Sequence, residues 1–359
     1  MPGIVRIINL KIFKYTSITN NKQMGIKYLT RLLKDNAPSS ITHEQLYQLS
    51  GKIVAIDTSL FMYQCLMNIR RNGELMKNSN GKVTSHIYGM FFKIANYLSL
   101  NITPIFIFDG KPPDAKSDVI KKRKEKANYA TIKKNECTSK EDIEKQDKMS
   151  IRLTKEYIID IKILLSYMGV SYLHIDGEAE AIASELCRIG YVDYVLTEDM
   201  DTLVYGSPKL IRNCLDKSLK RKDIISIIDY GEMIKGMNLS EEQFIKFCIL
   251  CGCDYCSNVP KVGNITALKM IKKYTNIEDI IEEYKNKYKF PEGYAELFNK
   301  SYDIFMMYRD KIKVEELDVH KSNKDMGGLI KFMVNDIEMN ELRVQKAVKK
   351  TQNTLGNNI

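Results

Sequence analysis

The chain has 359 residues and 44% hydrophobic content, and its 55 lysines and arginines against 45 acidic residues give a formal net charge of +10. This length supports one large α/β domain or two ordinary domains with a sizeable core. No stretch approaches the roughly 18 consecutive apolar residues of a membrane-spanning helix, so we expect no membrane insertion. The basic excess favours a polyanionic partner such as nucleic acid.

The first 23 residues differ from the rest of the chain because they contain no acidic side chain. Their apolar pieces, IVRIINL and KIF, are interrupted by charge, which argues against the core of a secretory signal. A transit-like segment is one interpretation. We favour the other, a non-native upstream start, in which case the working protein begins at Met24.

Two segments of the first half predict buried strands that end at an aspartate. The segment GKIVAIDTSLFMYQ (51–64) predicts a strand that ends at Asp57 and is followed by a helix. The segment ITPIFIFDGKPP (102–113) predicts a second strand that ends at Asp109, with a turn set by its glycine and prolines.

Two further strands are predicted in the second half. The segment SYLHIDGEAEAIASELCRIG (171–190) predicts a short strand, a turn at Gly177 and a helix that ends at Gly190. The segment DYVLTEDMD (193–201) predicts a strand followed by acidic residues. Helical segments separate these strands, so we expect an α/β fold with a mostly parallel central sheet flanked by helices.

A highly charged segment lies between Lys111 and about Glu156. It is helical in composition but poor in large apolar residues, so it should project from the core. A solvated helical hairpin and a flexible linker both fit this composition. Its front half is mainly basic.

Two helices are predicted on either side of a glycine-containing connection. The segment NLSEEQFIKFCILCG (238–252) predicts a helix that begins at a capping box, Ser240 with Gln243. The segment KVGNITALKMIKKY (261–274) predicts a turn at Gly263 and a second amphipathic helix. Such a pair either packs together as part of the core or presents the free N–H groups of the second helix to a phosphate.

Acidic residues gather where these strands and helices end. Parallel strands have their C-terminal ends at one edge of a sheet, where ligands bind. We expect Asp199 and Asp201, two apart in an extended segment, to face the same site. Glu178 and Glu180 can both reach it only if Glu178 precedes its helix, because residues two apart on a helix diverge by about 200°. The full set comprises Asp57, Asp109, Glu178, Glu180, Asp199, Asp201 and Asp254.

Seven carboxylates in one pocket require a cationic partner. Two of them about 4 Å apart repel by roughly 4 kcal/mol at an effective dielectric of 20, and a whole domain is stable by only about 5–15 kcal/mol. An all-oxygen ligand set favours Mg²⁺ or Mn²⁺, with two ions favoured over one. Two ions roughly 3.5–4 Å apart are the usual apparatus of phosphodiester hydrolysis. One strand-end aspartate alone would instead be interpreted as a turn or helix cap.

Other chemistries have less support in the sequence. The four histidines form no H-E-x-x-H pattern, no G-x-x-x-x-G-K-[ST] or G-x-S-x-G motif occurs, and His86 is expected to be structural. The eight cysteines are interpreted as reduced thiols. Those of CILCGCDYC (248–256) lie too close together in sequence to fold easily around zinc, and Cys248 belongs to an apolar helical face.

In this order, the motifs resemble those of the flap endonuclease family, the eukaryotic and archaeal 5′ nucleases that act on branched DNA. The matching stretches are MGIKYLTRLL, VAIDTSLFMYQ, TSHIYGMFF, FIFDGKPPDAKS, GEAEAIASEL, TEDMDTLVYGSP and FCILCGCDYC, with a weaker LIKFMVND, between Met24 and about Lys350. The resemblance implies a PIN-like 5′ nuclease fold with a projecting helical arch and a helix–two-turn–helix DNA-binding element. It also implies that the seven carboxylates form the family's two-metal site.

The resemblance implies roles for further residues. Lys116 and Arg123, seven apart on one helical face, match basic residues that contact the scissile phosphate from the base of the arch. Tyr63 matches an aromatic residue on which a nucleotide stacks, and a place in the core is the alternative. Arg70 matches a DNA-contacting arginine, and a solvated surface charge is the alternative.

Three features depart from the family pattern. A retained extension of 23 residues would crowd Gly25, which matches the processed glycine beside the family's active site and is assigned here to DNA binding. The DNA-binding turn at Gly263 reads PKVGNITA, with Lys261 where the family usually has glycine, which weakens the expectation of a K⁺ ion there. The tail AVKKTQNTLGNNI lacks the family's clamp-binding motif, so recruitment by a sliding clamp is doubtful.

We therefore divide the chain into regions by these features. The regions are an extension (1–23), an N-terminal nuclease region (24–127), a basic arch (111–156), an internal nuclease region (157–275) that includes the helix–two-turn–helix (240–274), and a C-terminal helical region and tail (276–359).

The expected function is that of a Mg²⁺-dependent, structure-specific 5′ flap endonuclease and 5′→3′ exonuclease of DNA replication and repair. Its expected partners are branched DNA, namely 5′ flaps and nicked or gapped duplex, which it would bind as a monomer. The alternatives are a mainly exonucleolytic or nucleotide-excision-type nuclease of the same superfamily, and a non-catalytic branched-DNA binding module with eroded metal ligands. A nuclear location is the family expectation, and a cytoplasmic replication site is expected if the source is viral.

Overall fold

The computed structural model describes residues 26, 28–216, 218–219 and 223–353. A seven-stranded sheet lies at its centre. In chain order its strands are β1 (Ile41–Gln45), β2 (Ile53–Asp57), β5 (Thr103–Phe108), β6 (Tyr172–His174), β7 (Tyr194–Leu196), β8 (Lys209–Asn213) and β9 (Ile224–Asp229). The spatial order is β1-β9-β8-β7-β2-β5-β6. The strands from β8 to β6 are parallel, and β9 and β1 add an antiparallel edge, so the predicted mostly parallel sheet is confirmed.

Four of these strands, β2, β5, β6 and β7, were predicted from the sequence, whereas β8, β9 and β1 were not. The run of isoleucines in β9 was a usable signal, whereas β1 (ITHEQ) is polar and half-exposed and has no strand pattern of its own.

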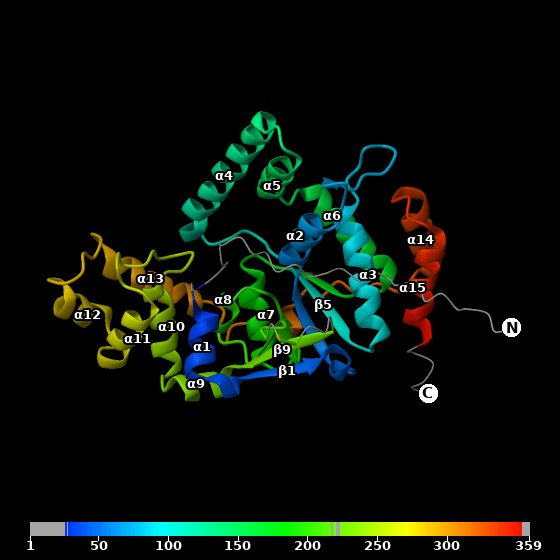
Figure 1. The fold of residues 1–359 in the computed structure, drawn as a ribbon. Helices are drawn as coiled ribbons and strands as arrows, with labels where there is room; N and C mark the ends of the chain where they lie inside the picture. Colours follow the sequence, from blue (N-terminus) through cyan, green and yellow to red (C-terminus); the bar gives the residue numbers. More distant parts are fainter. Residues whose placement is uncertain (1–25, 27, 217, 220–222, 354–359) are drawn as a thin grey trace.

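Helices cover both faces of the sheet (Figure 1). The α-helices of the described residues are α1 (Leu29–Asn36), α2 (Thr58–Asn68), α3 (Ser85–Ser99), α4 (Ser117–Glu136), α5 (Lys140–Ser150), α6 (Lys155–Met168), α7 (Ala179–Arg188), α8 (Asp201–Val204), α9 (Tyr230–Met237), α10 (Glu241–Cys251), α11 (Asn264–Lys273), α12 (Ile277–Tyr284), α13 (Tyr294–Met306), α14 (Met326–Lys331) and α15 (Glu341–Asn353). None of the described helices is long and apolar enough to span a membrane.

Alternate residues of the central strands face two different cores. Val54 and Ile56 of β2 pack with α2, α3 and α6, whereas Ala55 between them packs with α7 on the other face. Because both faces are covered, the strands read as continuous apolar runs. Packed helices therefore support both faces of the central strands, at whose C-terminal ends Asp57 and Asp109 lie.

A third core forms a lobe beside the sheet from α1 and α9 to α13. The predicted capping box of Ser240 and Gln243 starts α10, and Gly263 is the N-cap of α11 as expected. In the connection between these helices, Lys261 has a left-handed backbone with φ 67. Lys261 stands where the resemblance to the flap endonuclease family implies a glycine.

Helices α4 and α5 project from the body as a hairpin (Figure 1). Ala127 and Ala130 of α4 are its buried positions, whereas no residue of α5 is buried. The prediction that this charged segment projects from the core is therefore confirmed. Of the two interpretations left open by its composition, the helical hairpin is confirmed and the flexible linker is wrong. The first helical turn of the hairpin starts close to the C-terminal edge of the sheet.

Candidate active site

Two aspartates lie at the C-terminal ends of neighbouring parallel strands. Asp57 ends β2 and is the N-cap of α2, where its Oδ1 accepts a hydrogen bond from the Leu60 amide at 3.1 Å. Asp109 follows β5, and its Oδ1 accepts from the Ala179 amide at 2.9 Å. Asp57 pairs in register with Ile107 of β5, so the sheet brings both carboxylates to one edge.

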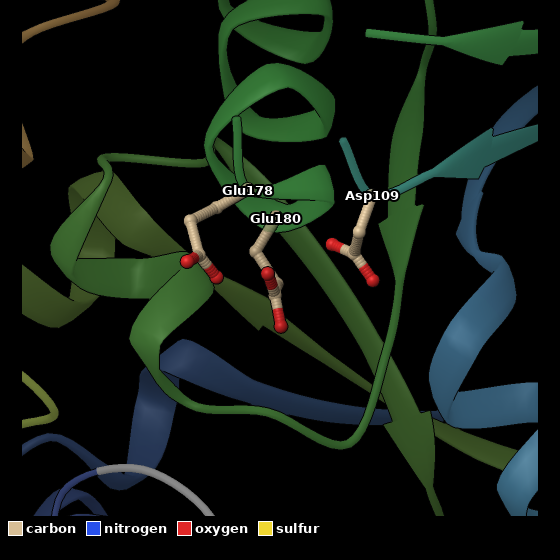
Figure 2. Close-up of side chains that lie close together, drawn as sticks. All are labelled: Asp109, Glu178 and Glu180. Atoms are coloured by element: carbon tan, nitrogen blue, oxygen red, sulfur yellow. The ribbon is translucent and has the colours of Figure 1, made fainter. Parts of the chain in front are cut away.

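Glu178 and Glu180 come from the start of α7. Glu178 is the N-cap, with φ −84 and ψ 129, and the helix begins at Ala179. Glu178 therefore precedes the helix, as is required for both glutamates to reach one site. Both lie beside Asp109 (Figure 2). One carboxylate oxygen from each of these three acids lies within 4.8 Å of the others. This all-oxygen group fits a divalent metal ion.

The next two acids follow β7 in a conformation that the sequence analysis predicted wrongly. Instead of an extended segment, Met200 has helical φ −80 and ψ −12, and Asp201 is the first residue of α8. The Asp201 amide donates to Asp199 Oδ1 at 3.0 Å, a local bond by which aspartate favours turns over strands. Both side chains still reach the site, where they interact electrostatically with Asp254.

Two cations at the base of the arch contact this acidic cluster. Lys116 Nζ lies 2.5 Å from Glu178 Oε2 and 3.2 Å from Asp254 Oδ2, and an Arg123 nitrogen lies 3.0 Å from Asp254 Oδ2. Burial lowers the pKa of Lys116, but the carboxylates of Glu178 and Asp254 outweigh burial and raise this pKa above the ordinary lysine value. Lys116 therefore stays charged at every physiological pH.

Burial raises the pKa of Asp57 and Glu180, and repulsion by neighbouring carboxylates adds to the rise. Burial first, and then the neighbouring Asp109, raise the pKa of Asp57 to about 7. Burial and the charges of Asp57, Asp199 and Asp109 raise the pKa of Glu180 well above its ordinary value. The close packing of these carboxylates therefore opposes ionisation of all of them at once, and a bound cation would offset this repulsion.

Two acceptors of the acidic cluster are buried without a partner among the described residues. Glu178 Oε1 and Asp201 Oδ1 have no hydrogen bond within the described part of the chain. A buried carboxylate oxygen without a donor is costly unless a cation or a hydrogen bond satisfies it. These two unpartnered oxygens therefore support divalent metal binding, in addition to the large number of carboxylates in the cluster.

The four residues predicted to bind DNA lie outside the acidic cluster or outside the described residues. Tyr63 on α2 is 37% exposed. Arg70 begins the hairpin of β3 (Arg70–Arg71) and β4 (Glu74–Leu75), and it is ion-paired with Asp147 of the arch with only 5% of its side chain exposed. Gly263 caps α11 with φ −97, a conformation open to any residue. Gly25 lies outside the described residues, and the DNA contacts of all four stay predictions.

Two hydroxyl groups that were not predicted from the sequence hold the carboxylates of Asp57 and Asp109 in place. The Ser59 hydroxyl donates to Asp109 Oδ2 at 2.5 Å, and the Thr197 hydroxyl donates to Asp57 Oδ2 at 3.3 Å. A signal was present, since Ser59 stands two residues after Asp57 and Thr197 stands two residues before Asp199.

Comparison with known proteins agrees with this geometry. Residues 24–130 match the XPG N-terminal domain, and residues 169–254 match the XPG I-region. Flap endonuclease 1 of Glycine max is 39% identical over 332 residues, which are 91% of this chain and 86% of that protein. The structure of flap endonuclease-1 from Methanococcus jannaschii has a TM-score of 0.68 at 30% identity and covers 93% of this chain and 100% of its own. The catalytic core of Rad2 in complex with DNA substrate shares the fold, with a TM-score of 0.66 at 22% identity over 91% of this chain and 100% of its own. The chain therefore belongs to the flap endonuclease family of XPG-type nucleases.

Proposed function

We propose that the protein is a structure-specific 5′ flap endonuclease with 5′→3′ exonuclease activity, which hydrolyses DNA phosphodiesters at the base of 5′ flaps. One observation carries the proposal, namely that the carboxylate cluster and two cations converge where a helical arch leaves the sheet. Its substrates are branched DNA, including nicked and gapped duplex, and its setting is nuclear DNA replication and repair, where it acts as a monomer.

The proposed cofactors are two Mg²⁺ ions, for which Mn²⁺ can substitute. The residues that would hold them are Asp57, Asp109, Glu178, Glu180, Asp199, Asp201 and Asp254. Such a pair of ions supplies an activated water and stabilises the charge on the phosphate and on the leaving oxygen. These seven proposed ligands are all hard oxygen donors, which favour Mg²⁺ over softer metals.

Lys116 and Arg123 would position the scissile phosphate. Both cations face carboxylates in the structure, and a phosphate oxygen offers the same hydrogen-bond chemistry. Arg123 can bind it with two parallel N–H groups, and Lys116 acts as a point charge. Because Lys116 remains charged in the acidic pocket, it can stabilise the phosphate without a proton transfer.

The pair of α10 and α11 would hold the duplex. The start of α11 would offer backbone amides to a DNA phosphate, and binding there would replace the hydrogen bond that the Ile265 amide donates to Asn264 Oδ1 at 3.0 Å. The turn before Gly263 is the proposed position of a K⁺ ion. The strained Lys261 in this turn distinguishes it from the family pattern.

The test is cleavage of a 5′-labelled double-flap DNA with Mg²⁺ by the protein that starts at Met24, with Asp201→Ala alongside. Cutting at the flap base by the wild type alone supports the proposal. Equal binding without cutting by both proteins would instead support a branched-DNA binding module. Preference for nicked duplex over the flap would favour the mainly exonucleolytic alternative.

A further inference from the structure

Asp57 and Asp109 are held by the same pair of interactions. In each aspartate, Oδ1 accepts a backbone amide at the start of a helix, from Leu60 for Asp57 and from Ala179 for Asp109. In each, Oδ2 accepts a side-chain hydroxyl, from Thr197 at 3.3 Å for Asp57 and from Ser59 at 2.5 Å for Asp109. Two carboxylates that lie far apart in the sequence thus have identical sets of donors.

The hydroxyl groups connect neighbouring strands in the order of the sheet. Thr197 follows β7 and supports the aspartate of β2, while Ser59 follows β2 and supports the aspartate of β5. The Thr197 hydroxyl also accepts the Asp199 amide at 3.1 Å, so one side chain links two acidic segments. Thr197 and Asp57 are 1% and 3% exposed, respectively, so water does not compete for their hydrogen bond.

The amide and hydroxyl donors leave part of the hydrogen-bond capacity of Asp57 and Asp109 unused. An ionised carboxylate has about four lone-pair sites, two on each oxygen. The amide and the hydroxyl occupy one site on each oxygen of Asp57 and Asp109, so one site on each oxygen stays available. Because the two donors come from different elements, the carboxyl group cannot rotate without breaking one of the bonds.

We propose that Thr197 and Ser59 are positioning residues that orient the free lone pairs of Asp57 and Asp109 toward a divalent cation. This inference rests on the proposed function, since it concerns the same acidic site. Neither hydroxyl contacts the DNA or the ion in this role. Partners of this kind typically change metal affinity by about 10–100-fold when they are removed.

The experiment measures metal binding directly, without cleavage. Chelator-treated protein is titrated with Mn²⁺, and the free ion is followed by its electron paramagnetic resonance signal. Thr197→Val, which keeps the shape but removes the hydroxyl, is compared with Thr197→Ser, which keeps the hydroxyl. Thr202→Val is the matched control, because the Thr202 hydroxyl is also fully buried but has no hydrogen-bond partner among the described residues.

We expect Thr197→Val to weaken Mn²⁺ binding by about tenfold or more, while Thr197→Ser and Thr202→Val bind like the wild type. Ser59→Ala provides a second test at a half-buried position, where folding is less at risk. The proposal is overturned if both Thr197→Val and Ser59→Ala bind Mn²⁺ like the wild type, or if Thr202→Val loses as much affinity as they do. Wild-type protein that binds Mn²⁺ but cuts no flap would contradict the proposed function while leaving this comparison intact.

Discussion

The Arg70 guanidinium donates to Asp147 Oδ2 at 2.5 Å, and this ion pair joins the β3–β4 hairpin to α5 of the arch. Arg70 also bonds to the carbonyls of Leu66 and Gly73, at 3.2 and 2.9 Å, which fixes its side chain. Lys134 of α4 reaches the other oxygen of Asp147 at 2.5 Å. One aspartate thus connects both helices of the arch to the body of the protein.

Asp147→Ala should therefore loosen the arch. The change removes two charge-assisted hydrogen bonds and leaves Arg70 buried without a counter-charge, and a bond of this kind is worth about 1.5–3 kcal/mol. We expect roughly tenfold faster amide hydrogen exchange in α4 and α5 by mass spectrometry. Glu136→Ala, at an exposed position of α4, is the control. Equal exchange in wild type and Asp147→Ala would show that the pair does not hold the arch.

Lys116→Ala and Arg123→Ala should each lower kcat for flap cleavage by about 10²–10³-fold, the range for losing one preorganised donor to a developing anion. Single-turnover cleavage of a labelled flap measures this effect. The exposed Lys122 serves as control, because it lies about 100° around α4 from Arg123. Lys122→Ala should weaken DNA binding only modestly. A loss confined to KM in the two test variants would contradict their contact with the scissile phosphate.

Lys261→Gly should stabilise the protein. Lys261 has φ 67, a left-handed backbone that costs a residue with a side chain roughly 1 kcal/mol and glycine almost nothing. The extra chain entropy of glycine offsets about 0.4–1 kcal/mol of this gain. We therefore expect the free energy of unfolding, measured by urea denaturation, to rise by at most about 0.6 kcal/mol. Lys269→Gly, inside α11, should have the opposite effect. A lower midpoint for Lys261→Gly would be inconsistent with backbone strain at this turn.

Because the His86 imidazole is buried, we expect the protein to lose stability as the pH falls. His86 is fully buried on α3, and its Nε2 lies 3.2 Å from Asp160 Oδ2. Burial lowers the pKa of His86, although the hydrogen bond that its Nε2 donates to the Asp160 carboxylate opposes this. Below about pH 6.5 the unfolded chain takes up a proton that the folded protein resists. The stability contributed by neutral His86 is therefore lost as pH falls from about 6.5 through the lowered pKa, by at most roughly 1.4 kcal/mol per pH unit.

His86→Gln removes this titration while keeping a polar group near Asp160. As the pH falls from about 7.5 to about 5.5, the wild type should lose free energy of unfolding that the variant keeps. The value for His86→Gln minus that for the wild type should therefore rise over this range. Urea unfolding of both proteins at the two pH values measures the difference. A difference that does not change with pH would contradict a buried neutral imidazole.

Sequence patterns predicted the acidic residues because strand ends and parallel connections fix where Asp57 and Asp109 lie. The helical turn at Asp201 was missed because its cause is a side-chain-to-backbone bond, which overrides the extended pattern before it. The ion pair of Arg70 and Asp147 could not be predicted, since it joins residues 77 positions apart whose contact depends on how the arch docks. Polar edge strands such as β1 are likewise defined by their partner rather than by their own sequence.

The hydroxyl and amide bonds to Asp57 and Asp109 have a consequence for folding. Side chains alternate along a strand, so a slip of one residue in β2 would turn Asp57 to the opposite face of the sheet. It would also separate Asp57 from Thr197, which reaches it only when β2 and β7 pair in the observed register. A divalent ion would then bind only to the protein whose sheet has the correct register, because only that register assembles the ligands. Metal binding would therefore stabilise the correctly folded sheet over the slipped one.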